Sequence, residues 1–253
     1  VVRTAVRPRA VKKLAALDVV EWIEADDAPY HEMNAVAAQR AHVSDLYTLP
    51  YELNGKDVVV GVWDGGAAYA HSDFGSRLQK MDSASVSNHA SHVAGTIAGS
   101  GAGNSSAKGM GPAINVKSYD WTNDTSEMVA GHSNGIRLSN HSYGYVVGWH
   151  WNGSSWVNYN NSDKFGMYST TTRQWDSIVG DTGLVVFKSA GNDRNDGPSY
   201  SKDGPFDCIP PIGNAKNIIT IGATSDSDEM SSFSSWGPTD DGRVKPDLCA
   251  NGV

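Results

Sequence analysis

Asp64 and His89 are residues whose types and surroundings could support acid–base chemistry. Asp64 ends an apolar run that begins at Val58 and is followed by two glycines, and His89 opens a stretch of small residues that suits a helix. An aspartate held at the end of a strand can orient a histidine, and that histidine can then act as a general base. Taken alone the aspartate motif is weak, because an Asp after a strand more often caps a turn.

Asn192 is a third residue with chemical potential. It follows an apolar run at 184–187 and a group of small residues at 189–191. Its side-chain amide is a neutral hydrogen-bond donor, which could stabilise an oxyanion without adding a charge that would perturb a nearby base. In isolation this motif also has a simpler interpretation, in which Asn192 is a turn residue.

A zinc site is the alternative interpretation of His89 and His92. These histidines are three residues apart with no glutamate between them, whereas zinc metalloproteases place two histidines four apart on a helix around a glutamate. We therefore favour His89 as the general base. His92 is expected to be a structural histidine that packs against the sheet.

The elements that would hold these residues alternate between strands and helices. Strands are predicted at 57–63, 114–119, 136–142, 184–189 and 217–223, and helices at 89–99 and 163–179. This alternation predicts an α/β fold with a doubly wound, mainly parallel sheet and helices on both faces. Ligands of such sheets bind at the carboxyl ends of the strands, and the three motifs fall there.

Together the three motifs resemble those of the subtilase family of serine proteases. The family carries an Asp motif, a His motif at a helix start, an Ala-Gly-Asn motif and a Gly-Thr-Ser nucleophile motif, and this sequence reproduces the first three in order. Further matches lie at 71–74, 108–112, 140–144 and 233–247. The resemblance implies a subtilisin-like fold over 34–253 and a serine endopeptidase, in which Asp64 orients the base, His89 is the base and Asn192 is the oxyanion donor.

The resemblance also implies a substrate-binding surface with two walls around a primary specificity pocket. The walls would be formed by Ser142, Tyr143 and Gly144 on one side and by Ser189, Ala190 and Gly191 on the other. A polypeptide substrate would add as an extended strand to the first of these segments. Because neither wall contains a charged residue, we expect a broad preference for an apolar or aromatic side chain in the pocket.

Three departures from the family pattern stand out. Gly65 occupies a position where the family usually has a hydroxyl residue, and Ala90 and Ser91 replace the usual Gly-Thr after the catalytic histidine. No Gly-Thr-Ser motif occurs in the 253 residues. We therefore expect a fragment that is incomplete at its C-terminus, lacks the nucleophilic serine and is inactive as given. The alternative is a non-catalytic, subtilase-like binding protein.

Residues 1–33 resemble the C-terminal end of a subtilase propeptide, an inhibitor-like domain. The mature enzyme would then begin near 33–36 and have its own propeptide as a partner. The Asp-Gly-Gly and His-Ala-Ser-His variants of the motifs resemble a branch of secreted bacterial subtilases. We accordingly expect a zymogen that is secreted or extracellular.

Charge and composition limit which other partners and cofactors we expect for this protein. The net charge of -8 argues against nucleic acid, and the sequence has no apolar run long enough for a membrane helix. Cys208 and Cys249 could form one disulfide or remain two buried thiols. No cofactor is required for the expected chemistry. Calcium is common in the family, and four acids in predicted loops were considered as ligands: Asp120, Asp124, Asp226 and Asp228. Their spacing matches no recognisable calcium-binding loop, so calcium binding is possible but no site is assigned.

A carbohydrate-active protein is the alternative from another enzyme class. It is suggested by the tryptophan-rich stretch 149–156, since aromatic side chains stack on sugars. However, no pair of carboxylates suggests the acid and base of a glycosidase. A surface loop packed on itself is the better interpretation.

Overall fold

The computed structural model describes residues 13, 16–17, 33–196 and 206–253. The chain divides into two units, Val1–Glu32 and Met33–Val253. The propeptide prediction falls on the first unit, which lies almost entirely outside the described residues. The second unit holds the described sheet and helices.

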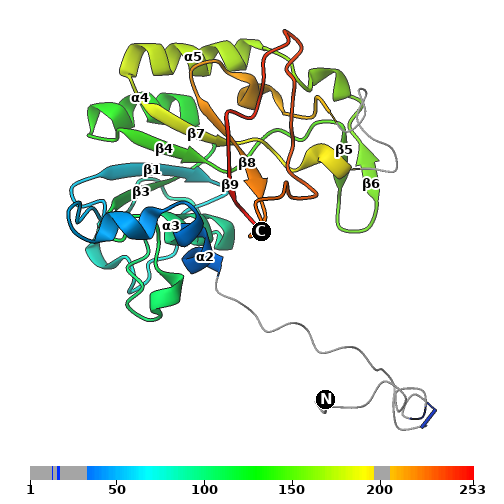
Figure 1. Ribbon diagram of the computed structural model, residues 1–253. Coiled ribbons are helices and arrows are strands. Elements are labelled where there is room, and N and C mark those ends of the chain that lie inside the picture. The colour runs from blue at the N-terminus through cyan, green and yellow to red at the C-terminus, as the bar shows by residue number, and fades with distance from the viewer. Residues whose placement is uncertain (1–12, 14–15, 18–32, 197–205) are drawn as a thin grey trace. The chain divides into compact units, whose positions relative to one another are not determined.

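Seven parallel strands form the central sheet of the second unit (Figure 1), in the order β2-β3-β1-β4-β7-β8-β9. The strands are β1 (Val59–Asp64), β2 (Leu78–Lys80), β3 (Asn115–Asp120), β4 (Leu138–His141), β7 (Val185–Ser189), β8 (Ile219–Thr224) and β9 (Leu248–Asn251). The chain enters the sheet at the interior strand β1, adds β2 and β3 on one side of it, and then adds β4, β7, β8 and β9 in turn on the other. This reversal is the mark of a doubly wound sheet, and it places a crevice at the carboxyl end of β1.

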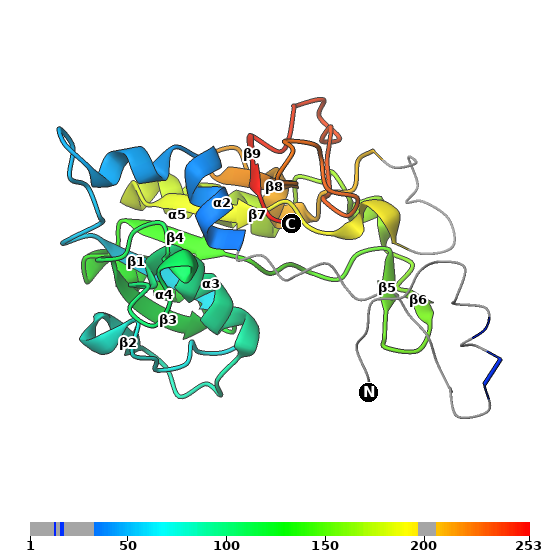
Figure 2. The ribbon, with the colours of Figure 1, turned by 60° about the horizontal axis from the view of Figure 1, so that its bottom comes forward.

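Helices cover both faces of the sheet, as predicted. In Figures 1 and 2, α4 and α5 lie on one face, and α2 and α3 lie on the other. The α-helices are α2 (Met33–Arg40), α3 (Asn88–Ala98), α4 (Asp124–Ser133) and α5 (Thr170–Thr182). Short 3-10 helices occur at Val43–Tyr47, Gly75–Arg77, Ser105–Ala107, Ser162–Lys164, Asp193–Asn195 and Pro211–Asn214.

Two hydrophobic clusters match these two layers. The cluster beneath α4 and α5 contains Trp63, Met128, Trp175 and Ile178 among others. The cluster beneath α3 contains Val60, Val62, Ala94 and Ala98 among others. Successive residues of β1 thus alternate between two buried layers, which explains why its sequence is an almost continuous apolar run.

Small residues let α3 lie close to the sheet. The hydroxyl of Ser87 caps its first turn by accepting a hydrogen bond from the amide of Ala90 at 3.2 Å. The buried face of α3 consists of Ala90, Ala94 and Ala98, which are spaced four residues apart. His92 lies on the opposite side of the helix and is exposed. The prediction that His92 packs against the sheet is therefore wrong.

The predicted helix at 163–179 begins too early. In the structure Ser162–Lys164 is a separate 3-10 helix, and α5 starts after Ser169, which forms a capping box with Thr172. α5 ends at Gly183, whose φ of 70° is the left-handed conformation that glycine adopts readily. Sequence analysis did not predict α4, because only Met128 and Gly131 of its ten residues are buried and its apolar pattern is weak.

The tryptophan-rich stretch forms an antiparallel hairpin of β5 (Trp149–Trp151) and β6 (Trp156–Asn158). Trp151 and Trp156 face each other across it, with ring centroids 5.6 Å apart in an edge-on arrangement. The stretch is therefore a loop packed on itself, as expected. Among the described residues, no helix is long and apolar enough to cross a membrane.

Cys208 and Cys249 are not joined to each other, so the disulfide alternative is wrong. Cys208 is buried, whereas Cys249 is exposed on β9. The other alternative, two buried thiols, holds for Cys208 only.

Candidate active site

Asp64 and His89 meet at the carboxyl end of β1. His89 Nδ1 lies 2.8 Å from both carboxylate oxygens of Asp64. Asp64 is 1% exposed and also accepts a hydrogen bond from the amide of Gly65 at 2.7 Å. The predicted contact between residues 25 positions apart is therefore present. Because the carboxylate accepts the Nδ1 proton, the lone pair of His89 lies on Nε2, and this imidazole is 61% exposed.

Gly65 lies directly beside Trp121. A Cβ atom at position 65 would lie 3.0 Å from two atoms of the Trp121 ring, so the ring would have to shift slightly to make room for a side chain. Trp121 is half exposed and packs in turn against the ring of Tyr143, with centroids 5.5 Å apart. The space next to Asp64 is thus taken up by an aromatic ring.

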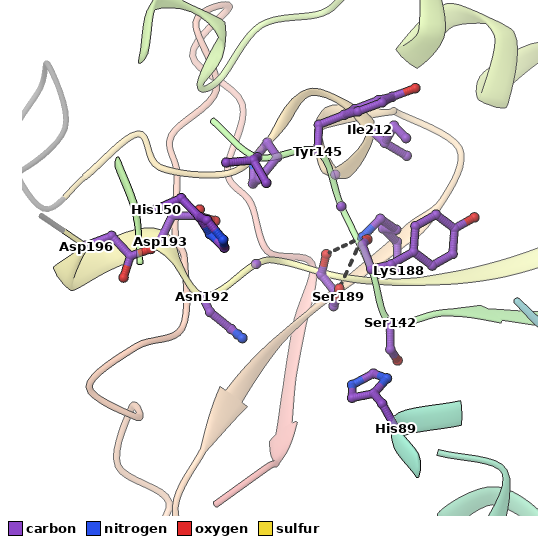
Figure 3. A pocket seen from close by; sticks show the side chains of 16 residues that line it. His89, Ser142, Tyr145, His150, Lys188, Ser189, Asn192, Asp193, Asp196 and Ile212 are labelled. Atoms are coloured by element: carbon purple, nitrogen blue, oxygen red, sulfur yellow. Dashed lines mark hydrogen bonds between the residues drawn. The ribbon is translucent and has the colours of Figure 1, made fainter. Parts of the chain in front are cut away.

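Asn192 lines the same cavity as His89 (Figure 3). It follows β7 through Gly191, whose φ of 106° is strained for any side chain and whose added Cβ would lie 2.7 Å from a carboxylate oxygen of Asp193. This turn changes the direction of the chain just after β7, at the carboxyl edge of the sheet. The cavity has a volume of about 330 Å³.

The structure brings most of the predicted pocket residues to this cavity. Ser142, Tyr143 and Gly144 line it from the end of β4, and Ser189 and Gly191 line it from the end of β7. Ala190 does not line the cavity and is 1% exposed, packed below it. Sequence analysis missed the remaining lining residues, which are Tyr145, Val146, His150, Lys188, Asp193, Asp196, Pro210, Ile212 and Gly213.

A buried polar chain fixes the wall at Tyr143. Its hydroxyl donates to Asp124 at 2.7 Å and lies 3.0 Å from Nδ1 of His141, whose Nε2 lies 3.1 Å from the hydroxyl of Ser139. Burial raises the pKa of Tyr143 well above its usual value, and the charge of Asp124 adds to this effect. Burial, aided by the charge of Lys188, holds the pKa of His141 well below its usual value, so His141 is neutral.

Lys188 brings a charge into the cavity between the two uncharged walls. Its side chain is 4% exposed, lines the cavity and donates to the backbone oxygen of Tyr143. Two acids, Asp193 and Asp196, also line the cavity. The two predicted walls carry no charge, but they are only part of the lining, and the rest of it includes these three titratable side chains.

The four acids considered for calcium each accept hydrogen bonds from protein groups. Asp120 and Asp124 accept from the amides of Thr122 and Thr125, Asp226 accepts from Asn251, and Asp228 pairs with Arg40. Among the described residues, no three His, Cys, Asp or Glu side chains are grouped so as to hold a metal ion. The zinc alternative for His89 and His92 thus has no ligand cluster in that part of the chain.

The sequence matches the subtilase family over residues 55–253. The chain belongs to this family. Serine protease AprX of Bacillus subtilis (strain 168) is 27% identical over 235 residues, which cover 86% of this chain and 51% of AprX. The subtilisin-like serine protease Pen ch 13 of Penicillium rubens is 24% identical over 248 residues, which cover 90% of this chain and 56% of that protein. This subtilase chain thus spans about half the length of the curated relatives it matches.

Solved structures agree with the subtilisin-like fold. The CspB protease of Clostridium perfringens superposes with a TM-score of 0.64 at 12% identity, covering 88% of this chain and 81% of that chain. The prenylagaramide maturation protease PagA gives a TM-score of 0.58 at 19% identity, covering 83% of this chain and 68% of that chain. At these identities the similarity establishes the doubly wound α/β fold.

Proposed function

We propose that this subtilase is a serine endopeptidase that hydrolyses polypeptides through an Asp-His-Ser triad. The observation that carries the proposal is the hydrogen bond from His89 Nδ1 to the buried Asp64, with His89 and Asn192 lining one cavity. That arrangement leaves Nε2 of His89 free to take a proton from a hydroxyl placed in the cavity. The reaction uses side chains and backbone groups, and no cofactor takes part in it.

The proposed reaction has two halves. In the first, Nε2 of His89 takes the proton of a serine hydroxyl while the serine oxygen bonds to the carbonyl carbon of the scissile peptide. The amide of Asn192 donates to the oxygen that becomes negative. The C–N bond then breaks, and the leaving amine takes the proton from His89. In the second half, water replaces the amine, attacks the acyl-enzyme ester in the same way and releases the carboxylic acid.

The substrate is proposed to bind as an extended strand along Ser142–Gly144. This segment continues β4 beyond its last paired residue, so its backbone groups lie at the carboxyl edge of the sheet beside the cavity. Backbone hydrogen bonds would supply affinity, and the cavity would receive the side chain on the amino side of the cleaved bond.

The nucleophile is proposed to be a serine outside these 253 residues. Among the described residues no hydroxyl is hydrogen-bonded to His89, and the sequence contains no Gly-Thr-Ser motif. Ser142 also lines the cavity, but its oxygen accepts a hydrogen bond from Asn140 at 3.0 Å. The 253 residues without that serine would not hydrolyse peptides at an enzymatic rate.

A fluorophosphonate probe tests this proposal on the protein expressed from its complete coding sequence. We expect one labelled serine, located by peptide mapping outside residues 1–253, and loss of labelling in His89→Ala. Labelling of a serine within 1–253 would contradict the assignment of the nucleophile. Absence of labelling and of peptide hydrolysis would favour the alternative, a non-catalytic binding protein.

The family resemblance also suggests how the protein is made and where it acts. Residues 1–33 would be the end of a propeptide that inhibits the enzyme, and 34–253 would belong to the catalytic domain. The protein would be secreted as a zymogen, and it would have neither nucleic acid nor a membrane as a partner. N-terminal sequencing of the secreted protein tests this, since maturation near 33–36 is expected. A secreted form that keeps residues 1–33 covalently attached would contradict it.

A further inference from the structure

Lys188 places an ammonium group between the two walls of the specificity pocket. Its Nζ donates to the backbone oxygen of Tyr143 on one wall, and lies 3.2 Å from the backbone oxygen and 3.1 Å from the hydroxyl of Ser189 on the other (Figure 3). Gly144 lies close to this ammonium, because a Cβ built at position 144 would be 3.9 Å from Lys188 Nζ, an ordinary van der Waals contact. The charge is therefore held at the inner end of the pocket.

Among the described residues, this buried charge has no carboxylate at ion-pair distance. None of the ion pairs of the described residues includes Lys188, although its side chain is only 4% exposed. Burial lowers the pKa of Lys188 to about 8, while Asp193 and Asp124 raise it from a greater distance. Buried ammonium groups are normally paired, since an unpaired charge out of water is costly. The cavity is where an anion could reach it.

The acids of the cavity lie away from Lys188. Figure 3 shows Asp193 and Asp196 grouped with His150 on the opposite side of the pocket. Burial raises the pKa of Asp193 to about 7, and it accepts a hydrogen bond from the hydroxyl of Ser235 at 3.3 Å. Asp193 is thus partly protonated near neutral pH. Its remaining charge opposes an incoming anion only weakly at the Lys188 end.

We propose that Lys188 makes this pocket select a polypeptide with an acidic side chain, glutamate or aspartate, on the amino side of the cleaved bond. The carboxylate would displace the weaker contacts to Ser189 and form the ion pair that Lys188 lacks. This inference rests on the proposed endopeptidase function and names its substrate class.

The sequence at the boundary between the two units agrees with this selectivity. The boundary falls between Glu32 and Met33. This boundary coincides with the start of 33–36, the region in which cleavage of the propeptide is expected. Of the four bonds that would make residue 33, 34, 35 or 36 the new N-terminus, only cleavage of Glu32–Met33 presents an acidic side chain to the pocket. We therefore expect self-processing at that bond.

The test measures kcat/KM for matched peptides that differ only in Glu, Gln or Leu before the cleaved bond, using the full-length enzyme. Glu should exceed Gln by between about tenfold and a hundredfold, the usual range for a hydrogen bond to a charged group. Lys188→Met should remove this preference, whereas Lys164→Met, which removes an exposed lysine and the same charge, should keep it.

The wild-type enzyme alone decides the question if Lys188→Met does not fold. Equal or better cleavage after Gln or Leu would overturn the inference and leave the endopeptidase function intact. Absence of both cleavage and fluorophosphonate labelling would overturn the function and the inference together. N-terminal sequencing gives an independent readout, because a mature chain starting at Met33 supports acid selection and a start at 34, 35 or 36 contradicts it.

Discussion

Asp64→Asn is the most informative substitution in the active site. In the wild-type protein Oδ1 of Asp64 accepts from the amide of Gly65 at 2.7 Å, and both carboxylate oxygens lie 2.8 Å from His89 Nδ1. An asparagine that keeps its oxygen on Gly65 must turn its NH₂ group toward His89. Two donors cannot face each other, so His89 then accepts at Nδ1 and carries its proton on Nε2.

This tautomer cannot act as a base toward the cavity, because the lone pair points the wrong way. The opposite amide orientation would place NH₂ against the Gly65 amide at about the same 2.7 Å, which replaces a buried hydrogen bond with a repulsive contact. Neither orientation of the asparagine amide therefore gives an active His89 tautomer without a cost. We expect kcat to fall about 10⁴-fold, the size seen when a triad aspartate becomes asparagine, or about 5.5 kcal/mol at 1.36 kcal/mol per factor of ten.

The assay is kcat/KM of the full-length enzyme on its best peptide, with active sites counted by fluorophosphonate labelling of the wild type. Asp181→Asn, an exposed residue of α5, is the matched control and should keep wild-type activity. The thermal unfolding midpoint of Asp64→Asn should stay close to that of the wild type, since the side chains have the same shape. An Asp64→Asn enzyme within tenfold of wild type would refute the role assigned to the Asp64–His89 pair.

Three further predictions address the donor, the pocket charge and the core. Asn192→Ala should lower kcat about 10²- to 10³-fold with little change in KM, as steady-state kinetics can show. The Glu-to-Gln ratio of kcat/KM should fall as pH rises from 7 through about 8, because Lys188 loses its charge as pH passes its pKa and Asp193, whose pKa is about 7, gains a negative charge in the same cavity; the groups that act on Lys188 are Asp193, Asp124 and His141. A ratio that rises across this range would contradict the ion pair. Trp175→Ala, at 1% exposure, should lower the free energy of unfolding by about 3–5 kcal/mol in denaturant titrations.

The sequence was enough to predict five strands of the sheet and the Asp64–His89 contact for a physical reason. A buried strand of a parallel sheet reads as an apolar run, and the motif residues directly follow such runs or open the next helix. β1 is buried along almost its whole length and β7 alternates between buried and partly exposed residues, yet both read as apolar runs, so Asp64 and Asn192 could be placed at the same edge. β2 and β9 were not predicted. The spacing of small residues in α3 could also have placed His92 on the exposed side, since Ala90, Ala94 and Ala98 already define the buried face.

The pocket charge could not be predicted in the same way. Lys188 lies on the same face of an apolar strand as the buried Val186, so alternation along the strand does not reveal that this face opens into a cavity at Lys188. Its direction depends on where the chain beyond β4 passes, and that path is set by tertiary contacts such as the bond from Tyr143 to Asp124. Side chains that reach a site from within the sheet are thus harder to find than those at strand ends.

Asp64 and the pocket wall that begins at Ser142 each follow directly on one tightly packed aromatic layer. Trp63, the residue before Asp64, stacks on His141 with ring centroids 5.1 Å apart, and His141 is the residue before Ser142. Trp175 packs edge-on against the same His141 ring, with centroids 4.6 Å apart. Each aromatic side chain is at most 1% exposed, so the layer leaves little room for displacement. The distance between Asp64 and the pocket wall is therefore set by packing within this layer, and the same sheet carries Lys188 into the pocket from β7.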